Sequence, residues 1–238
     1  MAAVDGRGRT CLRSLRSATP LNLRATPDGV YLVGGAAGPL GGDHLELDVE
    51  VGPGASLTLR TAAAAVALPG ANGEASTLAV RAGVGEGATL RWLPEPSVAA
   101  LGCRHHVQTH LVLAPGSRLV WREELLLGRH GEEPGCWRAR SVVDLDGAPL
   151  WRHELCLGPE VPGDDGPAVL GGSRAVGSVL VVDPAWAAGG PEPTVMSDTA
   201  AVLPLGGPAV VVTALAYDAV SLRARLDEGW RAAMSEKS

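Results

Sequence analysis

The decapeptide VGPGASLTLR, residues Val51–Arg60, contains the turn that decides the fold of this chain. In the segment before it, GDHLELDVEV, apolar and polar residues alternate strictly from His44 onward, so the apolar side chains share one face of a strand. Pro53 fixes φ at one turn position, and Gly54 tolerates the positive φ that a type II turn requires at the next. The alternation resumes in SLTLR. We predict a half-buried strand that turns back on itself at this corner.

The same pattern returns in VGEGATLRWL, from Val84, and in LAPGSRLVWR, from Leu113. Aligning Gly54, Gly87 and Gly116 places a small residue and a leucine in common columns at intervals of about thirty residues, as in repeat architectures. LDGAPL, around Gly147, has the form of a fourth, shortened copy. The expected fold class is mainly β, with stacked or helical layers of antiparallel strands, built from β-hairpins around one core, and a few helices.

The rest of the chain fits the same single domain, residues 1–238. We expect hairpin repeats over about 30–157, a Gly/Pro-rich segment over 158–208, and a C-terminal strand and helix over 209–234. Within the Gly/Pro-rich segment only Val179–Val182 has a clear strand pattern, and residues 164–208 otherwise fit loop, short helix or sheet edge equally well.

The C-terminal part gives a clearer pattern. AVVVTALAYD is typical of a buried strand, and DAVSLRARLDEGWRAA is typical of an amphipathic helix. Asp218 stands at the N-cap position, and Leu222, Leu226 and Trp230 share one stripe. We expect this helix to pack on the sheet or on a partner.

Composition limits the classes of function. A chain of 238 residues with 46% hydrophobic residues can bury a core without metal or disulfide. Its net charge is -6, and its 20 basic and 26 acidic residues are spread along the sequence, with no basic patch interleaved with aromatics. We therefore expect neither nucleic acid nor membrane as a partner. The N-terminus lacks an apolar signal core and no apolar stretch is long enough to span a bilayer, which predicts a cytoplasmic protein.

Sequence motifs for catalysis are missing. The only lysine is Lys237, so there is no phosphate-binding P-loop, and the glycines lie between strands instead of opening a helix. No G-x-S-x-G elbow is present. Glu123 and Glu124 are adjacent, so on a strand they point to opposite faces and cannot share a substrate. We predict no catalytic residue.

The strongest metal candidate is GCRHHVQTH, which contains Cys103, His105, His106 and His110. On a strand, Cys103 and His105 would lie on one face, and the other two histidines on the opposite face. At most two ligands would then converge locally, which favours ordinary strand residues over a weak capture site for Ni²⁺. The four cysteines are widely separated and fit reduced, structural thiols. No residue is therefore assigned as a ligand of a metal or cofactor.

Several short motifs occur together in a characteristic order. They are Gly41-Gly42-Asp43 before the alternating strand, the Pro-Gly-Ala corner, Trp92-Leu93-Pro94-Glu95-Pro96, Trp121 with Glu123, and Gly128-Arg129 followed by Gly131-Glu132. Over most of its length the chain resembles the urease accessory protein family UreD, called UreH in some organisms. The resemblance implies a mainly β fold and a non-catalytic scaffold. Such a scaffold would bind apo-urease, an all-helical F-type accessory protein and a G-type GTPase, and would help deliver Ni²⁺. It implies no tightly bound cofactor and only transient contact with Ni²⁺.

The chain departs from the family pattern at two places. Many relatives continue the first repeat with a Thr-Gln-Ala-Ala-Thr-Lys-like run, whereas TAAAAVALPG here keeps Thr61 and replaces the glutamine and lysine. Relatives also place an aromatic residue where this chain has Glu133. Two alternatives stay open: a metal-dependent β-fold enzyme that uses the Cys103, His105, His106 and His110 cluster, and a purely structural β-solenoid with neither partner nor metal.

Overall fold

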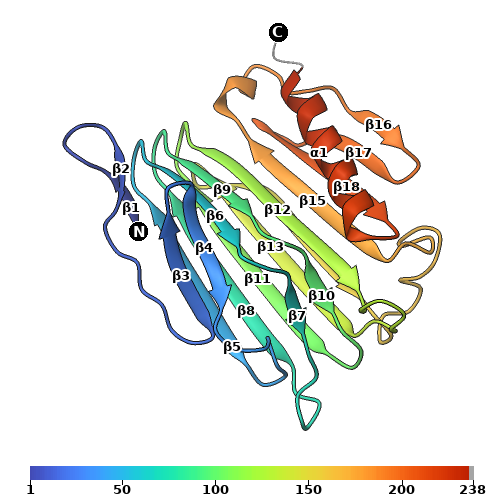
Figure 1. Cartoon of the computed structure of the whole chain (residues 1–238). Coiled ribbons are helices and arrows are strands. Elements are labelled where there is room, and N and C mark those ends of the chain that lie inside the picture. The colour runs from blue at the N-terminus through green and yellow to red at the C-terminus, as the bar shows by residue number, and fades with distance from the viewer. Residues whose placement is uncertain (236–238) are drawn as a thin grey trace.

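The computed structural model describes residues 1–235 and consists of two stacked β-sheets with one α-helix on the outer side of the second sheet (Figure 1). The strands are β1 (Ala2–Val4), β2 (Thr10–Leu12), β3 (Leu21–Thr26), β4 (Gly29–Gly34), β5 (His44–Val51), β6 (Ser56–Thr61), β7 (Ala65–Ala67), β8 (Ser76–Val84), β9 (Thr89–Leu93), β10 (Ser97–Ala99), β11 (Arg104–Leu113), β12 (Arg118–Leu127), β13 (Cys136–Leu145), β14 (Ala148–Leu157), β15 (Ala175–Val182), β16 (Thr194–Ser197), β17 (Ala200–Pro204) and β18 (Ala209–Ala216). A 3-10 helix, η1, covers Pro184–Trp186, and helix α1 covers Ala219–Ser235. The mainly β, layered fold class is confirmed.

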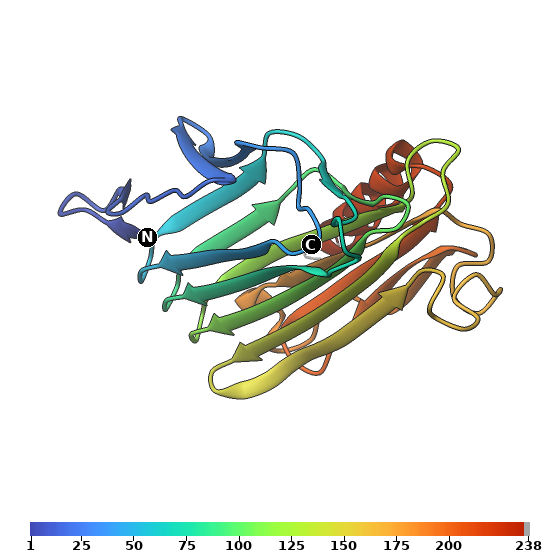
Figure 2. The same cartoon turned by 90° about the horizontal axis from the view of Figure 1, so that it is seen from below.

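The two sheets have different extents. Sheet A has the strand order β14-β13-β11-β8-β5-β1-β2, and sheet B has the order β16-β17-β18-β15-β12-β9-β6-β4-β3, with the short strands β7 and β10 beside this path. In Figure 2, the N-terminal hairpin lies at one end of the stack and helix α1 toward the other. Within residues 1–235, no helix combines the length and apolar character needed to cross a bilayer.

The repeated corners connect the two sheets. Strand β5 pairs in parallel with β8, and β6 pairs in parallel with β9, so the Pro53-Gly54 corner carries the chain from sheet A to sheet B. The predicted antiparallel hairpins of the repeats at Gly54, Gly87 and Gly116 are therefore wrong. Alternation and turn residues identify a corner but not the strands that pair across it. Parallel stacking of the repeats aligns equivalent residues, such as Leu57 with Leu90 and Leu90 with Leu119, and so keeps large apolar side chains in one layer.

The fourth copy, around Gly147, is a true hairpin. Strands β13 and β14 pair antiparallel, and the two turn residues Asp146 and Gly147 have φ values of 52° and 74°. Positive φ at both central positions matches the right-handed twist of a two-residue hairpin. The shortened copy therefore ends the parallel stack of sheet A by reversing the chain.

The predicted strand and helix faces are confirmed. Leu47, Val49 and Val51 of β5 are buried between the sheets, whereas the intervening polar residues are exposed. The rings of Trp92 and Trp121 stack in the same core with centroids 5.3 Å apart.

The segment left open at residues 164–208 contains β15, η1, β16 and β17, and Val179–Val182 is the second half of β15. Helix α1 packs on β15, β17 and β18. Asp218 Oδ1 accepts a hydrogen bond from the Ser221 backbone N–H at 2.8 Å, as expected of an N-cap, and Leu222 and Leu226 are fully buried. A Cβ at Gly229 would lie 2.4 Å from Val212 Cγ1, so glycine allows the helix to approach the sheet this closely.

Candidate functional site

The residues of the metal candidate GCRHHVQTH lie on and just before strand β11, which divides them between its two faces. His105 is buried between the sheets, where its Nδ1 lies 2.7 Å from Ser76 Oγ and its ring centroid 4.7 Å from that of Trp137. His110 is exposed on the other face, with Nε2 3.5 Å from Asp144 Oδ2. Cys103 is buried just before the strand. The expected division between two faces is confirmed, and no group of three or more metal-ligating side chains occurs among residues 1–235.

The surroundings of Cys103 and His105 favour their neutral forms. Burial, with a smaller contribution from Cys136, raises the pKa of the Cys103 thiol to about 11. Burial, with a smaller contribution from His106, lowers the pKa of His105 to about 4. A cysteine binds metal as the thiolate, which is disfavoured at this position. Both residues therefore have the properties of core residues.

The carboxylates of β12 lie in two different environments. Glu123 Oε1 accepts hydrogen bonds from Trp121 Nε1 at 3.0 Å and from Ser141 Oγ of sheet A at 3.3 Å, so Glu123 points between the sheets. The side chain of Glu124 is only 1% exposed and points to the outer side of sheet B. The expectation that the two glutamates cannot serve one substrate is confirmed.

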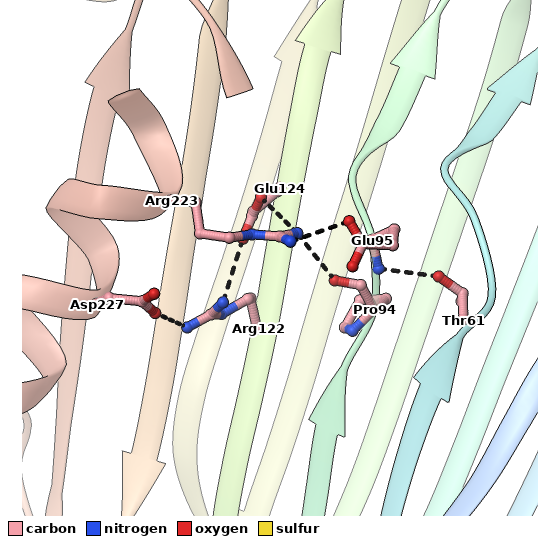
Figure 3. A network of polar contacts seen from close by, with 7 residues as sticks. All are labelled: Thr61, Pro94, Glu95, Arg122, Glu124, Arg223 and Asp227. Carbon is pink, nitrogen blue, oxygen red and sulfur yellow. Dashed lines mark hydrogen bonds and ion pairs between the residues drawn. The ribbon is translucent and has the colours of Figure 1, made fainter. Parts of the chain in front are cut away.

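A polar network, buried at Arg122 and Glu124 and partly exposed at its other members, joins helix α1 to sheet B, as Figure 3 shows. We name it the helix clasp, and it consists of Glu95, Arg122, Glu124, Arg223 and Asp227. Arg223 donates from Nε and Nη2 to the two oxygens of Glu124, at 3.1 Å each, and from Nη1 to Glu95 Oε2 at 2.9 Å. Arg122 pairs with Asp227 and lies 3.6 Å from Glu124 Oε1. The clasp thus links the helix, strand β12 and the turn after β9.

Arg223 is the central member of the clasp. Burial opposes its charge, but hydrogen bonds and attraction from Glu124 and Glu95 outweigh this and raise the pKa of the guanidinium. The guanidinium of Arg122 also lies 5.7 Å from the centroid of the Trp230 ring. A bidentate hydrogen bond from a guanidinium to a buried carboxylate fixes both the distance and the relative orientation of the two side chains. The clasp is therefore suited to hold α1 in one position on the sheet.

No motif in the sequence predicts this network. Glu95 stands out in Trp92-Leu93-Pro94-Glu95-Pro96, but the helix pattern identifies only the apolar stripe of α1. Arg223 and Glu95 are 128 positions apart, and no local pattern pairs them. The sequence feature that could have indicated the network is Arg223, which lies next to Leu222 in the buried stripe of the amphipathic helix.

The other motif residues also support the architecture. Thr61 Oγ1, in the repeat where the chain departs from the family pattern, accepts a hydrogen bond from the Glu95 backbone N–H at 2.8 Å. Arg129 donates to both carboxylate oxygens of Glu132, and this side-chain pairing is the main reason that the pKa of Glu132 falls to about 2. Gly128 has a φ of 77°, which glycine adopts without strain at this turn.

The outer face of sheet A is open and charged. Arg81 of β8 bridges Glu46 and Asp48 of β5, both at 3.2 Å. A shallow, open depression of about 340 Å³ beside this pair is lined by charged, polar and small side chains, including His110 and Arg140. Small-molecule sites are usually enclosed and mostly apolar, so this surface is better suited to a large partner.

The fold and these sites define a layered β-scaffold whose distinctive polar residues hold structural elements together, with broad faces open to solvent. Residues 2–237 match the family model described as UreD urease accessory protein. The chain belongs to the UreD family of urease accessory proteins. Membership confirms the resemblance and the expectation that the protein is an accessory factor and not an enzyme. The alternatives of a metal-dependent enzyme and of a solenoid without partners are set aside.

Individual relatives agree with this assignment. The chain is 47% identical over 251 residues to the urease accessory protein UreD of Parafrankia sp. (strain EAN1pec), covering 94% of this chain and 84% of the relative. It is 47% identical over 239 residues to UreD 3 of Streptomyces griseus, covering 97% and 93%. It is 51% identical over 213 residues to UreD of Frankia alni, covering 83% and 71%.

Proposed function

We propose that this protein is a cytoplasmic maturation scaffold that binds apo-urease, an F-type accessory protein and a G-type GTPase, and supports GTP-dependent insertion of Ni²⁺ into urease. The observation that carries the proposal is the match to the UreD family over residues 2–237. GTP hydrolysis belongs to the partner, because this sequence has no P-loop lysine. Ni²⁺ is cargo in this process, and its contact with the chain is transient.

The architecture supports a scaffold role. The sheets present wide outer faces, and stable protein interfaces bury on the order of 1,000 Å² or more, which flat sheet faces provide. The clasp holds α1 in a fixed position, so the helix and the neighbouring strands form one preformed surface. Preformed surfaces bind with a smaller loss of conformational entropy than mobile ones.

The test is co-expression of the tagged protein with apo-urease and the F-type and G-type proteins, followed by affinity purification and urease assay after addition of Ni²⁺ and GTP. We expect a complex that gains urease activity only when this chain, Ni²⁺ and GTP are all present. Omission of this chain is the matched control. Equal activation without it, or a monomer that purifies alone in every combination, would overturn the proposal.

A further inference from the structure

A stripe of arginines crosses the outer face of sheet B. Arg24 of β3 lies opposite Tyr31 of β4, and Tyr31 lies opposite Arg60 of β6. The inward neighbours of these residues, such as Leu32 and Leu59, are buried between the sheets, so the arginines point outward. These three residues therefore form one row across three strands.

The stripe continues diagonally across the next two strands. Arg91 of β9 lies opposite Thr58 and is therefore offset by two residues from Arg60, and Arg118 of β12 is offset by two residues from Arg91 in the same way. Strand spacing and rise place such diagonal neighbours about 8 Å apart at Cα, within reach of adjacent guanidinium groups. We name Arg24, Arg60, Arg91 and Arg118 the arginine stripe.

The charge of this stripe is largely unneutralised. Arg24 and Arg60 donate hydrogen bonds only to the backbone oxygens of Leu23 and Asp28, and within residues 1–235 neither they nor Arg91 forms an ion pair. Arg118, whose side chain is 52% exposed, is the paired member of the stripe, with Nε 3.8 Å from Asp183 Oδ1. The sequences of β3, β4, β6 and β9 contain no acidic residue. A protein with a net charge of -6 thus has one face where positive charge is concentrated.

Helix α1 does not cover the part of the outer face of sheet B that is formed by β3, β4, β6 and β9. Helix α1 contacts β18, β15, β17 and, more weakly, β12, and Figure 1 shows it over that side of sheet B while β9, β6, β4 and β3 extend beyond it. The outer face of sheet A has the opposite character at β5, where Glu46, Asp48 and Glu50 are exposed. As a whole, the outer face of sheet A carries both signs of charge, because Arg81 pairs there with Glu46 and Asp48 and Arg152 pairs with Asp144. The arginines of β3, β6 and β9 form no such ion pair within residues 1–235.

The chemistry of the stripe favours an acidic protein surface over nucleic acid. Single-stranded nucleic acid binds through several exposed aromatic rings, whereas the aromatic residue in the row with Arg24 and Arg60 is Tyr31, which is half-buried. A long polyanion is also repelled by the acidic remainder of the molecule, whereas a local acidic patch senses mainly charges within a Debye length of about 8 Å. Five adjacent strands provide the flat area that a protein interface requires.

We propose that the arginine stripe is a docking surface for an acidic surface of a protein partner. The proposal rests on the proposed function in assuming a protein partner, and it goes further in specifying the face and the charge of that partner. Guanidinium groups suit this task because they pair with carboxylates in two-pronged geometry and remain charged at all physiological pH values.

The first experiment measures binding of a fluorescent poly-L-glutamate peptide to the full-length protein at several salt concentrations. The stripe variant is Arg24→Ser, Arg60→Ser and Arg91→Ser combined. The control variant, Arg7→Ser, Arg13→Ser and Arg16→Ser, removes the same number of exposed arginines from the N-terminal segment. We expect about tenfold weaker binding by the stripe variant, because three guanidinium contacts with glutamate carboxylates are lost, and little change in the control. Equal losses in both variants would overturn the proposal, because net charge alone would then explain the binding.

The second experiment separates the classes of partner. Oligothymidylate of matched charge is titrated in parallel, and tighter, stripe-dependent binding of this probe would overturn the proposal in favour of nucleic acid. The unfolding midpoint of the stripe variant is first shown to equal that of the wild type. The variant is then co-expressed with apo-urease and the accessory proteins. We expect it to lose one partner that the control variant keeps. Full assembly of the stripe variant would refute the docking surface and leave the scaffold role intact. Failure of the wild type to assemble would refute the scaffold role, and the docking surface would then be tested by the peptide titration alone.

Discussion

Glu123 and Glu124 are consecutive residues of β12, yet their carboxylates lie on opposite sides of sheet B. Glu123 bonds to Ser141 of sheet A, and Glu124 bonds to Arg223 of helix α1. One strand therefore ties together both sheets and the helix. Acid-base catalysis needs two groups that reach one substrate, and this arrangement instead uses each carboxylate to hold a different element.

The clasp predicts a large loss of stability on removal of Arg223. Arg223→Ala leaves the carboxylate of Glu124, 1% exposed, with only the more distant Arg122 as a partner. We expect the free energy of unfolding to fall by about 3 kcal/mol, because an inadequately paired buried charge is costly. Urea unfolding followed by tryptophan fluorescence measures the change. Arg231→Ala, at an exposed position of the same helix, should change stability by less than about 0.5 kcal/mol, and equal midpoints for the two variants would contradict the role of the clasp.

The corners predict an effect of backbone conformation alone. Gly87 has a φ of 64° and no atom within 4 Å of the position of a Cβ, so Gly87→Ala should cost about 1 kcal/mol through the left-handed conformation. Gly206→Ala is the matched control, since nothing lies within 4 Å of its Cβ position either and its φ lies outside the positive region. Thermal unfolding compares the two. If both variants melt together, the corner does not depend on glycine.

Sequence patterns predicted which face of a strand or helix is buried and where the element ends, but not which strands pair with each other. The alternation up to Val51 and the stripe of Leu222 and Leu226 are local, so they could be read correctly from spacing. The choice between a hairpin and a connection between sheets at Gly54 depends on which strands pair, and those strands come from different repeats. Loop and strand propensities carry no information about that choice.

The surface charge distribution could not be predicted from the sequence for the same reason. The arginine stripe brings together residues from β3, β6, β9 and β12, so an even spread of charge along the sequence becomes a concentration of charge on one face. The expectation concerned a basic patch interleaved with aromatic residues, and the stripe has only the half-buried Tyr31 beside it. The exclusion of nucleic acid stays a prediction, and the oligothymidylate titration tests it.

The buried thiol predicts selective alkylation. With a pKa of about 11, Cys103 has a thiolate fraction of about one in a thousand at pH 8, and burial restricts access to it as well. Iodoacetamide should therefore label Cys11, Cys136 and Cys156, which are half-buried, before Cys103 in the folded protein. Mass spectrometry of timed digests measures the order. Labelling of Cys103 as fast as the others would show an exposed thiolate and would revive it as a metal ligand.

The buried histidine predicts a pH dependence of stability. The pKa of His105 is about 4 in the folded protein and about 6.5 in the unfolded chain, so between these values only the unfolded chain takes up the proton. The contribution of His105 to stability is therefore fully present above pH 6.5 and is lost as the pH falls toward 4. Between pH 7 and pH 5 the expected loss is about 2 kcal/mol, from 1.5 pH units at 1.36 kcal/mol each.

The slope of stability against pH, not its absolute value, tests this prediction. His105→Asn loses the titrating group and part of the contact with Trp137, so it should be less stable at pH 7 but show a shallower slope between pH 7 and pH 5. Gln108→Asn changes an exposed, uncharged residue of β11 and should keep the wild-type slope. Urea midpoints at several pH values for the three proteins decide the matter. A wild-type slope in His105→Asn would show that the pKa of His105 does not differ between the folded and unfolded states, which would contradict the effect of its burial.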